Sequence, residues 1–237
     1  MALSRILPNV ATKYGAPYGR VSHDQSAEPL SVLRMTIDCQ GYDAGGAYWG
    51  TGDNSMWVLT SDDLESISYV RSSTRAGAIE QFVTQGYEEA RIRPDAINPE
   101  NVDAGALPAV LSSFLEIGIT MQHDDYLDNV LGGEYEVDQM VPPSIADLDI
   151  IDIRKAAEIC KAFLERAGSA VTEAYETGGY DEVQMGYDLY MERVGSGVGF
   201  HDRDLPEHIA ETLSTSAGQG DIDLFVNREN TAPSVSP

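Results

Sequence analysis

The spacing of apolar residues changes along this chain, and that change limits the folds it can adopt. Residues 30–39 (LSVLRMTIDC), 55–60 (SMWVLT) and 65–71 (ESISYVR) alternate in polarity or are rich in β-branched and aromatic side chains, as strands are. Residues 107–131 and 150–167 instead repeat apolar side chains every three or four positions, as amphipathic helices do. Strands and helices in separate blocks predict an α+β fold.

Three units follow from this pattern. Residues 1–93 are predicted to form a β-meander with one helix packed on it, after an irregular stretch over residues 1–29. Residues 94–180 form an acidic helical centre. Residues 181–228 form a ββαβ unit, and residues 229–237 a disordered tail. The elements expected in the third unit are a hairpin of strands over 187–193 and 197–201, a helix over 207–217 and a strand over 221–226.

Local signals support several of these boundaries. A helix over residues 74–86 is expected to end at Gly86. Ser144 and Asp147 have the spacing of a capping box at a helix start. Gly168 is expected to interrupt the long central helix, which resumes over residues 170–176, and Pro206 is expected to start the helix over 207–217.

The charge of the chain is strongly negative and unevenly placed. Lys and Arg number 15 against 39 Asp and Glu, a formal net charge of −24. Residues 94–153 hold many acids and no Lys or Arg, so this region should repel nucleic acid and anionic lipid, and direct binding of duplex DNA is not expected. The acidic face is assigned to Asp124, Asp125, Asp128, Glu134, Glu136 and Asp138. Three explanations for this excess of acidic residues are open: solubility, adaptation to a salty cytoplasm, and imitation of a polyanion.

The glycine-rich stretch 41–53 (GYDAGGAYWGTGD) raises the question of a phosphate-binding loop. It has no Lys and no GK[ST] motif, and a strand rather than a helix follows it, so a hairpin loop is the better interpretation. Its aromatic residues can fold over the sheet edge or form a surface for a ligand or partner. The candidate binding residues are Tyr42, Asp43, Tyr48, Trp49, Arg71 and Arg75.

No set of residues predicts catalysis, a metal or a cofactor. His123 lies beside two aspartates, and His201 and His208 lie near Asp202 and Asp204, which an acidic chain produces by chance. Cys39 and Cys160 are far apart in apolar patterns, which favours two buried free thiols in a reducing cytoplasm. No apolar run is long enough to span a membrane, and the first residues do not resemble a signal peptide.

Three segments carry a resemblance to a known group of proteins. They are Tyr14–Arg20 (YGAPYGR), the block GYDAGGAYWG with YVRSSTRA over residues 69–76, and the stretch from Gly178 to Val226. The first two resemble uncharacterised proteins of phage genomes, plasmids and integrative elements. The third is similar to a mobile-element module with the pattern GHDFWLTRNGHGAGFWDR-DL, although Ser196 replaces the turn histidine and His201 the tryptophan of that pattern.

The resemblance implies a mobile-element source and no particular activity. Together with the charge, it predicts a non-enzymatic accessory protein in the host cytoplasm that contacts a basic protein surface through its acidic face. DNA mimicry, as practised by antirestriction proteins, is the specific form of this hypothesis. The alternative is a module that binds single-stranded nucleic acid through loop 41–50 with Arg71 and Arg75.

Overall fold

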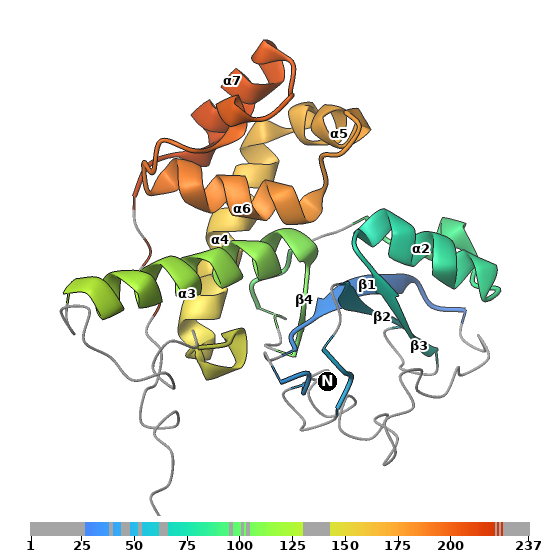
Figure 1. Ribbon diagram of the computed structural model, residues 1–237. Helices are drawn as coiled ribbons and strands as arrows, with labels where there is room; N and C mark the ends of the chain where they lie inside the picture. The colour runs from blue at the N-terminus through green and yellow to red at the C-terminus, as the bar shows by residue number, and fades with distance from the viewer. Residues whose placement is uncertain are drawn as a thin grey trace, which may run out of the picture.

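The computed structural model describes residues 27–37, 40–43, 48–51, 54–61, 66–94, 97–100, 102, 105–129, 143–220, 222 and 224. In this part of the chain lie one four-stranded sheet and six α-helices (Figure 1), which confirms the α+β class. Residues 1–26 and the predicted tail 229–237 lie outside the described residues.

The sheet is antiparallel throughout, with strand order β3-β2-β1-β4. It is formed by β1 (Leu30–Met35), β2 (Ser55–Ser61), β3 (Ile67–Ser72) and β4 (Ala106–Leu107). The predicted hairpin across the glycine-rich loop is confirmed, because β1 pairs with β2 in a register that places Leu30 opposite Ser61. The short strand β4 was not predicted, and it pairs with β1 on the side opposite β2.

Both faces of the sheet are buried. Trp57, Leu59 and Val70 face helix α2 (Arg75–Thr84), where they pack with Phe82. The side chains that alternate with them, including Met56 and Val58, belong to a second cluster. A strand buried on both faces reads as a continuous apolar run, which explains the sequence SMWVLT.

Helix α2 begins and ends as the sequence predicts. The Thr74 hydroxyl accepts a hydrogen bond from the Gly77 amide at 3.1 Å, which caps the helix. Gly86 follows the last turn with φ of +102°, a conformation that glycine adopts without steric cost.

The predicted central helices are also confirmed. They are α3 (Ala109–Asn129), α4 (Ile150–Ala167) and α5 (Ser169–Glu176), with Gly168 separating the last two. Two short 3₁₀ helices also occur: η2 (Glu89–Arg91) lies in the chain between α2 and β4, and η4 (Ile145–Asp147) between α3 and α4. The capping box is present at η4, where the Ser144 amide donates to Asp147 Oδ2 at 2.8 Å.

The hairpin predicted over residues 187–193 and 197–201 is wrong, whereas the helix predicted over 207–217 is confirmed. Residues predicted as a hairpin form helix α6 (Glu182–Arg193) and the 3₁₀ helix η5 (Phe200–Asp202), followed by α7 (Glu207–Ala217). Ile222 and Leu224, expected in a last strand, have no strand pairing. The alternation in YDLYM misled the prediction because buried Asp188 interrupts an apolar helix face.

Helices α3 to α7 share one core. Phe114 on α3, Phe163 on α4, Leu189 on α6 and Leu213 on α7 are all fully buried in it. The sheet is connected to this core by Ala109 and Val183, which pack with the sheet–α2 cluster. None of the described helices combines the length and apolar character that crossing a bilayer requires.

Candidate functional site

The glycine-rich loop is held by its own tryptophan. Trp49 is 4% exposed, and its indole Nε1 donates to Asp43 Oδ2 at 2.7 Å. The ring packs on Tyr69 with centroids 4.9 Å apart. Residues 44–47 and 52–53 of the loop lie outside the described residues. Trp49 and Asp43, predicted as binding residues, are therefore buried together and anchor the loop to the sheet.

Arg71 fixes the loop backbone to β3. Its guanidinium donates to the carbonyl oxygens of Trp49 at 2.5 Å, Gly50 at 2.8 Å and Asn54 at 2.8 Å. Three carbonyl acceptors in one fork use most of the donors that a phosphate would need. The structure thus brings Arg71 to the loop, as the sequence suggested, but its guanidinium holds the loop backbone in place.

Arg75 lies away from the loop. It is 7% exposed at the start of α2, and its Nη2 donates to the Arg93 carbonyl at 2.6 Å. Its charge acts on Glu182, whose pKa is raised chiefly by burial and is partly lowered by the Arg75 charge. The predicted pairing of Arg71 and Arg75 on one surface is not formed.

Tyr42 and Tyr48 are the exposed part of the loop. They are 41% and 50% exposed, and their rings lie 5.1 Å apart in a tilted arrangement. The close approach of this loop requires Gly41, which has φ of +90° and whose Cβ, if present, would lie 2.8 Å from the Gly50 carbonyl carbon. A pair of exposed aromatic rings can stack on a planar or apolar group.

The acidic face is described only in part. Asp124, Asp125 and Asp128 are exposed in the last two turns of α3, whereas Glu134, Glu136 and Asp138 lie outside the described residues. Other acids of residues 94–153 have structural partners. Glu116 pairs with Arg34 at 2.7 Å, and Asp152 with Lys155 at 2.9 Å.

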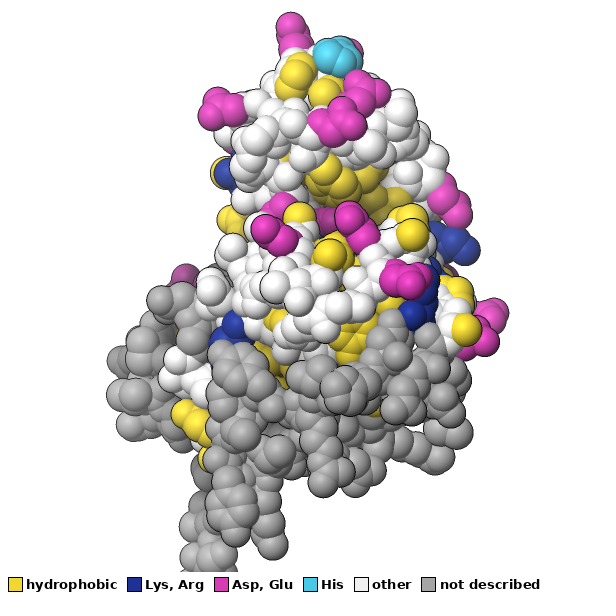
Figure 2. Space-filling view, turned by 90° about the vertical axis from the view of Figure 1, so that its right-hand side faces the viewer, with side chains coloured by type: hydrophobic (Ala, Val, Ile, Leu, Met, Phe, Trp, Pro, Cys, Tyr) yellow, Lys and Arg dark blue, Asp and Glu magenta, His cyan; other side chains and the backbone are white. Residues whose placement is uncertain are grey.

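Many arginines of the described chain are engaged internally. Arg166 donates to the Ser216 carbonyl at 2.9 and 2.7 Å, and Arg193 to those of Ala217 at 2.7 Å and Gly220 at 3.1 Å. Both satisfy carbonyls at the end of α7, where a positive charge is favourable. Figure 2 shows the result on one face, with acidic side chains scattered over the upper part and few basic ones.

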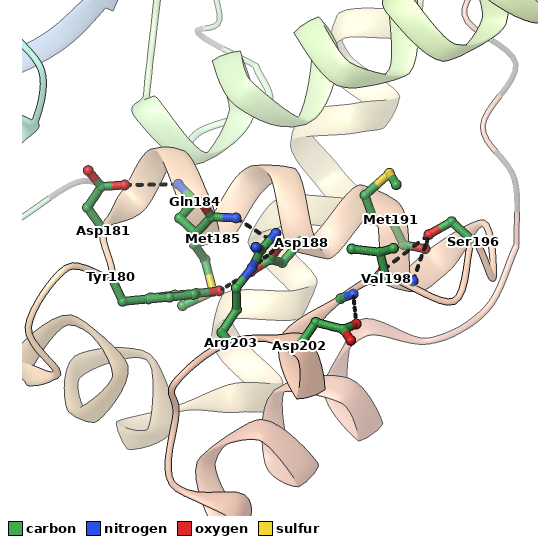
Figure 3. A network of polar contacts seen from close by, with 11 residues as sticks. Tyr180, Asp181, Gln184, Met185, Asp188, Met191, Ser196, Val198, Asp202 and Arg203 are labelled. Carbon is green, nitrogen blue, oxygen red and sulfur yellow. Dashed lines mark hydrogen bonds and ion pairs between the residues drawn. The ribbon is translucent and has the colours of Figure 1, made fainter.

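A buried ion pair joins α6 to the turn before α7 (Figure 3). Asp188 is 0% exposed and accepts from Arg203 Nε at 3.0 Å on each carboxylate oxygen and from Arg203 Nη2 at 2.6 Å. The Tyr180 hydroxyl donates to it at 3.1 Å and Gln184 Nε2 at 2.9 Å. This carboxylate lowers the free energy of the charged guanidinium and raises the pKa of Arg203.

Sequence reasoning missed the Asp188–Arg203 pair. A charged residue inside the apolar run YDLYM was the available signal, because a buried charge in a helix face needs a partner. Both oxygens of the carboxylate accept hydrogen bonds from side chains of the protein itself, so the pair holds α6 to the turn before α7. It also explains why Tyr180, whose pKa is raised by burial and then by Asp188, stays protonated.

The histidines of the described residues belong to no cluster of metal-binding side chains. Across the described residues no group of three or more His, Cys, Asp or Glu side chains is placed to hold a metal ion. His123 is buried on α3, and exposed His208 lies 3.7 Å from Glu173. Cys160 is fully buried in the helical core, where burial raises the pKa of its thiol; Cys39 lies outside the described residues.

No protein-family model matches the chain, and no curated protein or solved structure matches it.

Proposed function

We propose that the protein acts by non-enzymatic contact between its acidic surface and a basic surface of another protein. One observation carries this proposal: four arginines of the described residues donate to groups of the protein itself, while many carboxylates are exposed. Arg71, Arg166 and Arg193 donate to backbone carbonyls, and Arg203 to a buried carboxylate. These guanidinium groups are occupied by the protein itself, and the field of a chain with a formal net charge of −24 attracts a cationic partner.

The end of α3 is the proposed centre of the contact. Exposed Asp124 and Asp128 lie near the carboxyl end of the helix, and its last turn has no basic residue. Negative charge at that end opposes the helix dipole, at a cost of about 0.3–1 kcal/mol per residue. A basic partner surface would offset this cost, so the aspartates favour association more than they favour the isolated fold.

Imitation of a nucleic-acid backbone is the specific form that we propose for this contact. A partner that binds phosphates through Lys and Arg would also bind a surface of spaced carboxylates. The proposed source, a phage or other mobile element, rests on the resemblance of residues 14–20, 41–50 and 178–226. In that setting the partner is a basic DNA-binding protein of the host or of the element, in the cytoplasm.

Competition with DNA tests the proposal. A fluorescein-labelled duplex is bound to each of several basic DNA-binding proteins, and the chain is titrated in while fluorescence anisotropy is recorded at low and high salt. We expect displacement of the duplex by the wild-type chain at low salt and little displacement at high salt, because the contact is electrostatic. Failure to displace the duplex from any of these proteins would end the mimicry hypothesis.

A matched pair of charge variants locates the contact. The triple variant Asp124→Lys, Asp125→Lys, Asp128→Lys changes the charge of α3, and Glu158→Lys, Glu165→Lys, Glu176→Lys changes it equally on α4 and α5. All six positions are exposed. We expect the α3 variant to lose displacement by tenfold or more relative to the control. Equal losses would point to net charge alone and would remove α3 from the proposal.

Binding of single-stranded nucleic acid is the second candidate, favoured by exposed Tyr42 and Tyr48. Base stacking on aromatic rings contributes about 1–3 kcal/mol per base. Arg71 and Arg75 already donate to carbonyls, so this site would rely on stacking. Titration of a labelled oligothymidylate into the wild type and into Tyr42→Ser, Tyr48→Ser tests it. Equal or absent binding would exclude the loop.

A further inference from the structure

Two aromatic rings of the glycine-rich loop are exposed. Tyr42 and Tyr48 form an antiparallel bridge, and their ring centroids lie 5.1 Å apart with the planes tilted by 54°. Every other aromatic side chain whose exposure the structure describes is buried or half-buried. Leaving two rings in water forgoes the free energy that their burial would supply, so this pair is a candidate binding surface rather than part of the core.

The loop holds the two rings in place. The Trp49 amide donates to the Gly41 carbonyl at 2.7 Å, and Arg71 donates to the Gly50 carbonyl at 2.8 Å. The Tyr48 ring lies against Gly41, because a Cβ at that glycine would be 3.0 Å from Tyr48 Cε2. A ring that is already fixed loses little conformational entropy when another molecule binds to it, which is why tyrosine is frequent at binding surfaces.

Charge distinguishes the groups that such a pair can bind. Nucleic-acid bases and cations both bind to the faces of aromatic rings. A nucleotide brings a phosphate, which the field of a chain with a formal net charge of −24 repels. Arg71, a basic residue at this loop, already donates to three carbonyl oxygens. A cation is instead attracted both by the field of the chain and by the negative face of a ring.

The loop does not offset this attraction with a positive charge of its own. The charge of Arg71 is accompanied in the same loop by the carboxylate of Asp43, which accepts from Trp49 Nε1 at 2.7 Å. The negative charge of Asp43 also acts on Tyr69, whose pKa is raised by burial and then by this carboxylate. The two charges of the loop are therefore opposite, and the net charge of the chain decides the sign of the field.

We propose that Tyr42 and Tyr48 form a docking point for an arginine side chain of a partner protein. A guanidinium is planar and weakly hydrated and stacks on aromatic faces, whereas the ammonium of lysine is compact and strongly hydrated. The cationic character of the partner rests on the proposed function given above. In this arrangement the acidic surface attracts the partner, and the tyrosine pair fixes one of its arginines.

A titration of the full-length chain with small probes tests this inference. The chain carries ¹³C-labelled tyrosine, and the NMR signals of the two rings are assigned with Tyr42→Phe and Tyr48→Phe. The probes are the N-acetyl amides of arginine, lysine and citrulline, and thymidine 5′-monophosphate. Citrulline has the shape of arginine without its charge. We expect the Kd of the arginine probe to be about two- to fivefold lower than that of the citrulline probe, as for a cation–π contact at an exposed site.

Two variants show whether the second ring takes part. Tyr48→Phe keeps an aromatic face, so the Tyr42 signals should respond to the arginine probe as they do in the wild type. Tyr48→Leu keeps an apolar side chain without that face, and we expect it to weaken binding of the arginine probe by about twofold or more. Equal binding by the two variants would remove the pair from the proposal.

Other outcomes would also overturn the inference. These are ring signals that do not respond to the arginine probe, equal affinity for the arginine and citrulline probes, and equal affinity for the arginine and lysine probes, which would indicate attraction by net charge alone. Tighter binding of thymidine 5′-monophosphate would favour the nucleic-acid candidate instead. The titration does not involve α3 or DNA, so the docking point can fail while DNA displacement by the acidic surface holds, and the reverse.

Discussion

Substituting Asp188 by alanine should strongly destabilise the protein, because it leaves a guanidinium without its partner. Arg203 directs three hydrogen bonds at the Asp188 carboxylate, and Tyr180 and Gln184 one each. Removing one member of a buried ion pair typically costs about 3–5 kcal/mol. The Arg203 side chain is 28% exposed and can be partly rehydrated, so we expect the lower end, about 3 kcal/mol.

Urea denaturation followed by far-ultraviolet circular dichroism measures this loss. For a chain of this size, about 3 kcal/mol corresponds to a fall in Tm of about 6–12 °C. Asp204→Ala is the matched control, since Asp204 is an exposed aspartate in the same turn. Surface changes of that kind usually shift stability by less than about 0.5 kcal/mol.

A double-mutant cycle decides whether the pair itself is responsible. The variants are Asp188→Ala, Arg203→Ala and the combination of the two. We expect the combination to cost much less than the sum of the single variants, with an interaction free energy of about 2 kcal/mol. Losses that add to within about 0.5 kcal/mol would refute the reasoning, because independent sites behave in that way.

Two further predictions concern α6. Gly186→Ala would place a Cβ 2.1 Å from the Val110 carbonyl oxygen, so thermal melts should show a destabilisation of about 1–3 kcal/mol. The control Gly178→Ala, whose Cβ would have no atom within 4 Å, should leave the stability unchanged. Equal effects of the two substitutions would disprove the close contact of α3 with α6. Burial raises the pKa of Glu182 above 4.5, so its ionisation destabilises the fold progressively as the pH rises from 4.5, and the full cost is present above the raised value. Glu182→Gln should therefore raise Tm at neutral pH by an amount that shrinks as the pH falls toward 4.5, and a gain independent of pH would contradict this.

The predictions from sequence held where one local signal decided the structure. The stripe from Ile153 to Ala167 has an unbroken helical period, and Ser144 is a cap whose partner Asp147 lies three positions on, so no tertiary information was needed. They failed at α6, because Asp188 is polar but buried and so produced a false alternation. Its partner Arg203 is fifteen positions away, beyond the reach of any local pattern.

The candidate site was predicted less well than the fold. The sequence indicated that Trp49 and Arg71 belong near one loop, and the structure brings them into contact. It could not indicate that Arg71 donates to the backbone carbonyl of Trp49, because every residue has a carbonyl and the residue type does not show which one is used. Arg75 was assigned to the same surface, yet the start of α2 directs it to the Arg93 carbonyl.

The pairing of β4 with β1 has a consequence for the order of folding. The edge of the sheet is completed by Ala106 and Leu107, more than seventy positions after β1, and Arg34 then pairs with Glu116 in the first half of α3. During synthesis, a nascent chain that ends before β4 leaves one edge of β1 without its partner. Contacts over such sequence separations form slowly, so we expect the β-sheet to become stable only after α3 has left the ribosome.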